Sequence, residues 1–132
     1  MKFVWLGYAD EKLWASMPNE ERDSMSEECF AYNDFQRHGR HWTGVGEALR
    51  TSRAAKTLRW NGGKVVGTDG PYSETKELLG GVSMNRFSDI DRAVEAWSKH
   101  PCLRVGDVFE IRPTDEEFYA RIAASEALAA GR

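Results

Sequence analysis

The first apolar segment of the chain, residues 3–8, contains no charged position, so a strand formed there is apolar on both faces. A strand of this kind needs a cover on each face. Charged residues follow from Asp10 and end the segment. A helix is predicted next, beginning near Ser16 and Pro18, because serine caps helices and proline is tolerated in their first turn. The helix is expected to continue to about His38, where Gly39 supplies a C-terminal stop.

The rest of the chain alternates short apolar runs with turn residues and two further helical patterns. The run Asn61-Gly62-Gly63 predicts a β-hairpin, since these residues accept the positive φ of a tight turn. One helix is predicted from the capping sequence at Ser88 to about His100, and another from Thr114, with Glu117 completing a capping box. Strands are predicted at residues 41–49, 55–60, 64–68, 82–87 and 105–111.

This order of elements predicts an α+β domain with a ferredoxin-like fold, in which two main helices cover an antiparallel sheet, plus a C-terminal helix. The two helices can cover only one face of the sheet. The apolar character of residues 3–8 on both sides then requires a second cover, and another copy of the same sheet supplies it. We therefore expect a homodimer that pairs sheet faces.

Composition narrows the class of protein further. The chain has 132 residues, enough for one domain, and a formal net charge of -3 with acidic and basic residues interspersed, which argues against a nucleic-acid partner. No apolar run approaches the roughly 20 residues of a spanning helix.

Because the sequence has no secretory signal pattern, we expect no membrane partner and a cytoplasmic location. Cys29 and Cys102 lack metal-ligand spacing and are expected to be free thiols.

Residues 68–81, with the sequence TDGPYSETKELLGG, resemble the YCII-related family and specifically its DGPF-type branch. The opening strand, the start of the first main helix and the closing strand at residues 106–113 agree with this resemblance. It spans residues 1–113 and leaves residues 114–132 as a helical tail. Tyr72 stands where the motif has Phe, which keeps the ring and adds a hydroxyl. The resemblance implies a ferredoxin-like fold paired as a dimeric α/β barrel.

The resemblance leaves the function open. Some DGPF-type proteins are encoded beside extracytoplasmic-function sigma factors, and one branch of the wider group is a dehydrochlorinase that acts on a chlorinated hydroquinone. A His/Asp pair has been proposed as a catalytic dyad in that group. Alignment with its pattern places Glu28 at the position of the His and His100 at the position of the Asp, so the two residue types are exchanged. A carboxylate that orients an imidazole remains a proton-transfer couple.

Helical periodicity supports Glu28 separately, since an apolar stripe on one face includes it: Met25, Glu28, Tyr32 and Phe35. A carboxylate on an inward face needs a partner or stays protonated. Alternatively, Glu28 lies at the margin of the stripe and reaches solvent or an arginine. For His100, the alternative is a purely structural place near a helix C-terminus, where a cation is favoured.

The loop 69–79 is the second candidate site. Asp, Gly and Pro at its start are explained by turn geometry alone. If the loop also borders a cavity, it offers five side chains to a small-molecule ligand: Asp69, Tyr72, Ser73, Glu74 and Lys76. Trp5 and Trp42 are core residues or walls of a site for an aromatic ligand.

The leading hypothesis is therefore a small-molecule enzyme of lyase or isomerase type that transfers protons, with Glu28 and His100 as its catalytic pair. We expect no cofactor and no metal, because Gly39 interrupts the helix between His38 and His41 and leaves their geometry uncontrolled. The alternative is a non-catalytic ligand-binding or regulatory module, with an extracytoplasmic-function sigma factor as its candidate partner.

Overall fold

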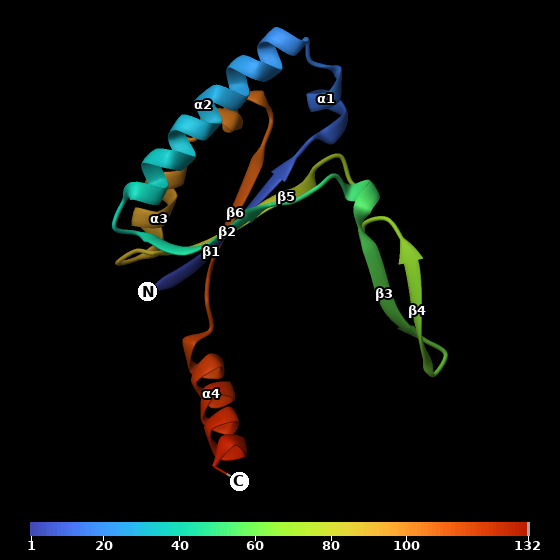
Figure 1. Cartoon of the computed structure of the whole chain (residues 1–132), viewed down its shortest axis with the longest axis vertical. Coiled ribbons are helices and arrows are strands. Elements are labelled where there is room, and N and C mark those ends of the chain that lie inside the picture. Colours follow the sequence, from blue (N-terminus) through green and yellow to red (C-terminus); the bar gives the residue numbers. More distant parts are fainter. Residues whose placement is uncertain (132) are drawn as a thin grey trace.

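Four antiparallel strands form the central sheet of the computed structural model, which describes residues 1–131 (Figure 1). Their order is β2-β5-β1-β6, and their bounds are Trp42–Ala48 (β2), Leu78–Arg86 (β5), Lys2–Ala9 (β1) and Val108–Pro113 (β6). The helices α2 (Asn19–His38) and α3 (Ile90–Trp97) both lie on one face of this sheet. The strand order and the two crossovers confirm the predicted α+β, ferredoxin-like fold.

The strand β1 occupies the middle of the sheet, which explains its unbroken apolar sequence. It pairs with β5 from Lys2↔Arg86 to Ala9↔Leu78, and with β6 from Phe3↔Pro113 to Tyr8↔Val108. Side chains alternate between the two faces of a strand. Phe3, Trp5 and Gly7 accordingly face the helices, whereas Val4 and Leu6 point to the opposite face.

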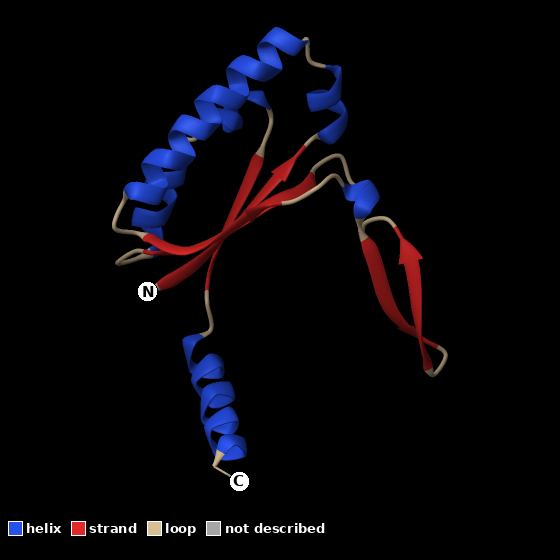
Figure 2. Cartoon of the chain, in the orientation of Figure 1, coloured by secondary structure: helices blue, strands red, loops and turns tan. Residues whose placement is uncertain are grey.

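The core beneath the helices is small. Its buried members are Phe3, Phe87 and Ala93, with Ala96 and Ile111 packed against them. The opposite face of the sheet has no cover within residues 1–131 (Figure 2). It is formed by apolar side chains of the two central strands, none of which is buried: Val4, Leu6, Tyr8, Val82 and Met84.

The first main helix agrees closely with the prediction, because α2 follows Pro18 and stops at Gly39. Ahead of it lies a short helix that the sequence analysis did not include, α1 (Glu11–Ser16). The side chain of Asp10 accepts a hydrogen bond from the backbone N–H of Leu13 and caps this helix. The charged residues after the first strand therefore begin a helix.

The caps of the later helices differ from those predicted. Asp89 caps α3, one residue after Ser88, and Asp115 caps α4 (Glu116–Ala130) in place of Thr114. The predicted capping box of Thr114 and Glu117 is wrong, because the Thr114 hydroxyl donates to the carbonyl of Lys2. A 3-10 helix, η2 (Pro101–Val105), occupies the segment before β6 and delays the predicted start of that strand.

Two elements extend away from the central sheet. The hairpin of β3 (Lys56–Asn61) and β4 (Lys64–Asp69) forms its own two-stranded sheet, preceded by the 3-10 helix η1 (Ser52–Ala54). Figure 1 shows the hairpin and α4 on the side of the sheet opposite α2 and α3. Within residues 1–131, no helix is long and apolar enough to cross a membrane.

Candidate functional site

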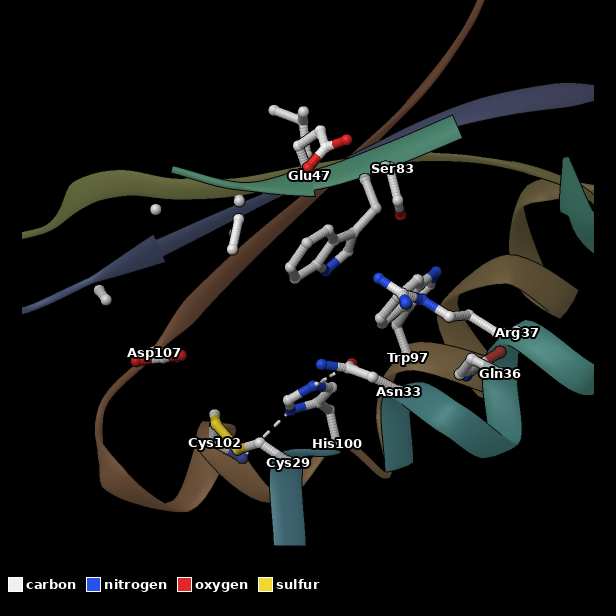
Figure 3. A pocket seen from close by; sticks show the side chains of 18 of the residues that line it. Cys29, Asn33, Gln36, Arg37, Glu47, Ser83, Trp97, His100, Cys102 and Asp107 are labelled. Atoms are coloured by element: carbon white, nitrogen blue, oxygen red, sulfur yellow. Dashed lines mark hydrogen bonds between the residues drawn. A yellow bond between two sulfur atoms is a disulfide. The ribbon is translucent and has the colours of Figure 1, made fainter. Parts of the chain in front are cut away.

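A cavity of about 270 Å³ lies between the helix-covered face of the sheet and the segments α2 and η2 (Figure 3). Strands supply its floor, and α2 supplies three of its polar side chains, Asn33, Gln36 and Arg37. The side chains that line it include Trp5, Cys29, Asn33, Gln36, Arg37, Trp42, Ser83, Trp97, His100, Cys102 and Asp107.

Glycines on the floor of the cavity let two indole rings lie flat against the sheet. A Cβ atom at Gly7 would lie 2.5 Å from Cη2 of Trp5, and one at Gly46 would lie 2.6 Å from Cη2 of Trp42. Both distances are far below a normal carbon contact, so only glycine leaves room for the rings. The sequence at these positions therefore shapes the cavity for a flat, apolar ligand surface.

The deeper wall of the cavity is aromatic. The rings of Trp5 and Trp97 are stacked with centroids 4.6 Å apart, and Phe109 meets the Trp5 ring edge-on at 5.0 Å. The Nε1 atom of Trp5 is buried and has no hydrogen-bond partner within residues 1–131. A buried indole N–H normally has an acceptor, so this atom is an unsatisfied donor behind the wall of the cavity.

His100 projects from the end of α3 and caps η2. Its Nδ1 accepts a hydrogen bond from the backbone N–H of Cys102 at 3.1 Å. In the neutral ring, Nε2 therefore carries the proton and donates to Oδ1 of Asn33 at 3.3 Å. Burial lowers the pKa of His100 to about 4, because four aromatic rings surround it: Trp5, Tyr32, Trp97 and Phe109. The ring is thus neutral at physiological pH.

Asp107 is an ionisable group of the cavity that the sequence patterns did not predict. It lies between Gly106, which ends η2, and the first residue of β6, and its backbone N–H donates to the carbonyl of Cys102 at 3.2 Å. Burial raises the pKa of this carboxyl to about 6. One feature of the sequence could have identified Asp107 as a candidate: it directly precedes an apolar strand, within the closing segment that resembles the YCII-related family.

The polar rim of the cavity comes from one face of α2. Asn33, Gln36 and Arg37 line it, and Figure 3 shows their side chains on the same side as His100. The guanidinium of Arg37 lies over the ring of Trp42, 5.5 Å from its centroid. A cation held in this way can meet an anionic group that enters the cavity.

Glu28 and His100 are not brought together. Glu28 accepts two hydrogen bonds from Nη2 of Arg104, at 2.9 and 3.0 Å, and half of its side chain is exposed. It borders a separate hollow beside Met25, outside the cavity that His100 lines. The predicted pairing of the two residues is therefore not formed, and the alternative of an arginine partner for Glu28 describes its position.

The reason is a rotation of α2 relative to the predicted stripe. Phe35, expected on the inward face, is 73% exposed. Cys29, Asn33 and Gln36 face the cavity instead, with the same i, i+4, i+7 spacing. The inward face is therefore more polar than hydrophobicity alone predicted.

The side chains predicted to bind ligand in the loop 69–79 lie elsewhere. Asp69 forms an exposed ion pair with Lys56, and the ring of Tyr72 lies 5.2 Å from the guanidinium of Arg59. Tyr72 and Ser73 border a hollow between the loop and η1, whereas Glu74 and Lys76 are exposed and line neither this hollow nor the cavity of His100. None of the five predicted residues lines the cavity that holds His100.

The two cysteines correct another prediction. Cys29 in α2 and Cys102 in η2 form a disulfide across 73 positions of sequence, so the expectation of free thiols is wrong. The bond joins the two helical segments that hold the polar side of the cavity, and both cysteines line it. Sequence spacing carries no signal for such a long-range contact.

Comparisons with known proteins agree with the resemblance found in the sequence. The profile of the YCII-related domain matches residues 1–116. An uncharacterized protein of Rhizobium meliloti (strain 1021) is 29% identical to this chain over 96 residues, which are 72% of this chain and 76% of the relative. The matched family region contains every side chain of the cavity and leaves nearly all of α4 outside.

Proposed function

The chain belongs to the YCII-related family, and we propose that it is a small-molecule enzyme of lyase or isomerase type that transfers protons within the cavity. The observation that carries this proposal is the Asp107 carboxyl in the cavity wall, whose pKa burial raises to about 6. A general acid or base works best when its pKa lies near the operating pH. Asp107 then takes the carboxylate role that the sequence analysis gave to Glu28.

His100 keeps its predicted place in the mechanism with a different task. Because its pKa is lowered to about 4, the neutral ring does not compete with Asp107 for a proton near neutral pH. Hydrogen bonds to both ring nitrogens, from the backbone N–H of Cys102 and to Oδ1 of Asn33, fix the ring, so it offers a bound molecule a rigid packing surface. Asp107 removes or returns the proton, and His100 orients the substrate.

The lining of the cavity defines the substrate class. The indoles of Trp5 and Trp42 suit a compact aromatic or cyclic ring, and Arg37 suits a carboxylate or phenolate on that ring. A chlorinated hydroquinone, the substrate of one branch of the wider group, meets both requirements. Loss of a proton to Asp107 and of chloride to solvent would balance such an elimination.

The test is a binding screen followed by a turnover assay. Simple phenols, benzoates and a chlorinated hydroquinone are screened by thermal shift, and those that bind are followed by NMR for C–H exchange with D₂O and for chloride release. We expect Asp107→Asn to reduce turnover by at least about 100-fold, the usual contribution of a positioned acid or base. Asp34→Asn, which changes an exposed carboxylate on α2, serves as the matched control and should retain full turnover.

Two results would overturn the assignment. Turnover that survives Asp107→Asn but is lost in Glu28→Gln would restore the pairing predicted from sequence. Binding without any turnover would favour the second candidate function, a ligand-binding or regulatory module. Exposed aromatic and apolar side chains on the hairpin support that candidate, since they provide a surface for a protein such as an extracytoplasmic-function sigma factor: Leu58, Trp60 and Val65.

A homodimer formed through the open sheet face is also part of this proposal. The chain exposes 9976 Å², whereas a folded monomer of 15.0 kDa exposes about 7,000 Å². The excess is about 3,000 Å², at or above the area that one protomer buries in a large obligate dimer, so a dimer interface would account for most of it. The open apolar sheet face, the hairpin and α4 all lie on the same side, where a second copy would cover them as in a dimeric α/β barrel.

Sedimentation velocity tests the dimer. At micromolar concentration we expect the wild-type chain to sediment at twice 15.0 kDa. Leu6→Glu places a charge in the middle of the open face and is expected to give monomers, because an unpaired charge is costly inside an interface. Phe30→Glu is the control, since Phe30 is 69% exposed on α2 and lies away from that face. A monomeric wild-type chain would contradict the proposal.

Two finer predictions from the sequence stay proposals. The sequence of residues 68–81 supports membership of the DGPF-type branch. A cytoplasmic location also stays a proposal, and the disulfide between Cys29 and Cys102 bears on it. In a reducing compartment a disulfide is usually transient, and it then has a regulatory or catalytic use.

A further inference from the structure

We propose that the reduced protein binds a zinc ion through Cys29, His100 and Cys102, so that the same three side chains form either a disulfide beside a free imidazole or a metal site. One ligand atom from each residue lies within 4.8 Å of the other two. This proposal does not depend on catalysis by Asp107, since it concerns a different redox state of the chain.

The donor set selects the metal. Two thiolates and one imidazole are the ligands of soft and borderline cations, and Cys₂His sites with an open fourth position are typical of zinc. Carboxylate-preferring cations such as Mg²⁺ are disfavoured by two sulfur ligands. All three residues line the cavity, so the fourth position of the ion would face the cavity, open to water or an anionic ligand.

The backbone can accommodate both states. The Cα atoms of Cys29 and Cys102 are 6.6 Å apart, and each cysteine belongs to a different helical segment. Tetrahedral coordination with Zn–S bonds of about 2.3 Å separates the two sulfur atoms by about 3.8 Å. Rotation of the two side chains about their Cα–Cβ bonds can supply this separation while α2 and η2 stay in place.

The hydrogen bonds of the His100 imidazole resemble those of a histidine that binds zinc. Metal-bound histidines usually donate their second ring N–H to a fixed acceptor, which sets the tautomer. Here Nε2 donates to Oδ1 of Asn33, and Nδ1 lies on the side of the cysteines, where it accepts from the backbone N–H of Cys102. Zinc would replace that N–H as the partner of Nδ1.

Conversion of the disulfide state to the zinc-binding state requires a reductant, and a dithiol can serve as this co-reactant. A dithiol reductant transfers two electrons and two protons to the disulfide and becomes a disulfide itself, which leaves two thiols in this chain. Binding of Zn²⁺ then releases both thiol protons. Because the cavity is lined by both cysteines, a reductant has a route to the bond.

The experiment uses Co²⁺ as a coloured substitute for zinc and the full-length chain. The protein is reduced with a phosphine that does not bind the metal strongly, titrated anaerobically with Co²⁺, and then with Zn²⁺. We expect one equivalent of Co²⁺ to produce thiolate-to-metal charge-transfer and intense d–d bands, and Zn²⁺ to abolish them. The oxidised protein, which has no thiolate to offer, should give neither.

Substitution of each proposed ligand distinguishes specific Co²⁺ binding at this site from non-specific binding elsewhere on the protein. Reduced Cys29→Ser and Cys102→Ser should lose the charge-transfer band, and reduced His100→Gln should bind Co²⁺ at least tenfold more weakly. His41→Gln is the matched control, because His41 bonds to the carbonyl of Arg86 far from the cysteines and should leave binding unchanged. Circular dichroism of each reduced sample reports whether it is folded.

The proposal is overturned if the reduced wild-type chain binds Co²⁺ no better than Cys29→Ser, or if the oxidised chain binds it equally well. It is also overturned if the reduced chain is unfolded and zinc does not restore its structure. Turnover by Asp107 plays no part in these readouts, so failure of the zinc site and failure of the proposed catalysis are distinguishable.

Discussion

Reduction of the Cys29–Cys102 bond in the presence of a chelator is expected to lower the free energy of unfolding by roughly 4 kcal/mol. The cysteines are 73 positions apart, and a cross-link that closes a loop of this length removes about that much conformational freedom from the unfolded chain. The loss is large relative to the total stability of a domain of this size. It follows that the native core, which contains few buried side chains, depends on the bond.

The measurement is urea unfolding followed by circular dichroism, with and without reductant. Double substitution Cys29→Ser/Cys102→Ser should be as unstable as the reduced chain and should not respond to reductant. The bond also fixes η2 against α2, so the same loss should widen the cavity and weaken binding of any ligand found in the screen. Equal denaturation midpoints for oxidised and reduced protein would show that the bond contributes nothing to folding.

Most of the fold follows from local sequence patterns. The strands, the hairpin and the helices α2, α3 and α4 were all expected, since each depends on periodicity and on turn or capping residues a few positions apart. The missed elements are short. Asp10 caps α1 and His100 caps η2. Both helices are too short to show a hydrophobic periodicity in the sequence.

The candidate site was harder to predict because it depends on which way α2 is rotated. Each residue turns a helix by about 100°, so an error of one position moves Glu28 off the inward face and brings Cys29 onto it. Hydrophobic positions suggested the stripe with Phe35, whereas the buried face contains the polar residues that the cavity uses. Tertiary contacts, including the disulfide, select that rotation.

The carboxylate of the site illustrates a second limit. The position of Asp107 directly before a strand does not predict its protonation, because its raised pKa results from burial by segments distant in sequence. His100 was recognised from alignment, but its neutral state depends on four aromatic rings from four separate elements. Sequence alone identifies such groups as candidates and cannot assign their protonation.

These two groups are expected to give opposite pH dependences of stability. The pKa of Asp107 is raised from 3.8 to about 6, so the folded state binds its proton more tightly, and this contribution to stability grows as the pH falls from 6 to 4. The pKa of His100 is lowered from 6.5 to about 4, so the unfolded state binds its proton more tightly. That contribution is lost as the pH falls through the same window.

In the wild-type chain the two contributions largely cancel between pH 4 and 6, the window that the two pKa shifts share. Asp107→Asn removes one and should leave a variant that loses stability on acidification, whereas His100→Gln should leave one that gains. Because the cavity is open to solvent, we expect a change of about 1 kcal/mol for each group. The guanidinium of Arg37 also faces the cavity, whereas the carboxylate of Glu47 points to the opposite side of the sheet (Figure 3); both are exposed and are present in all three proteins.

Urea unfolding of the oxidised, metal-free proteins at several pH values between 4 and 7 measures these slopes. Effects from carboxylates elsewhere are common to the three chains and disappear when each variant is compared with wild type. Opposite deviations of the two variants would establish that Asp107 accepts the first proton to enter the cavity on acidification, and that His100 stays neutral. If the free energy of unfolding changed with pH in the same way for all three proteins, neither pKa would be shifted by the fold. The assignment of Asp107 as the acid or base of the site would then be wrong.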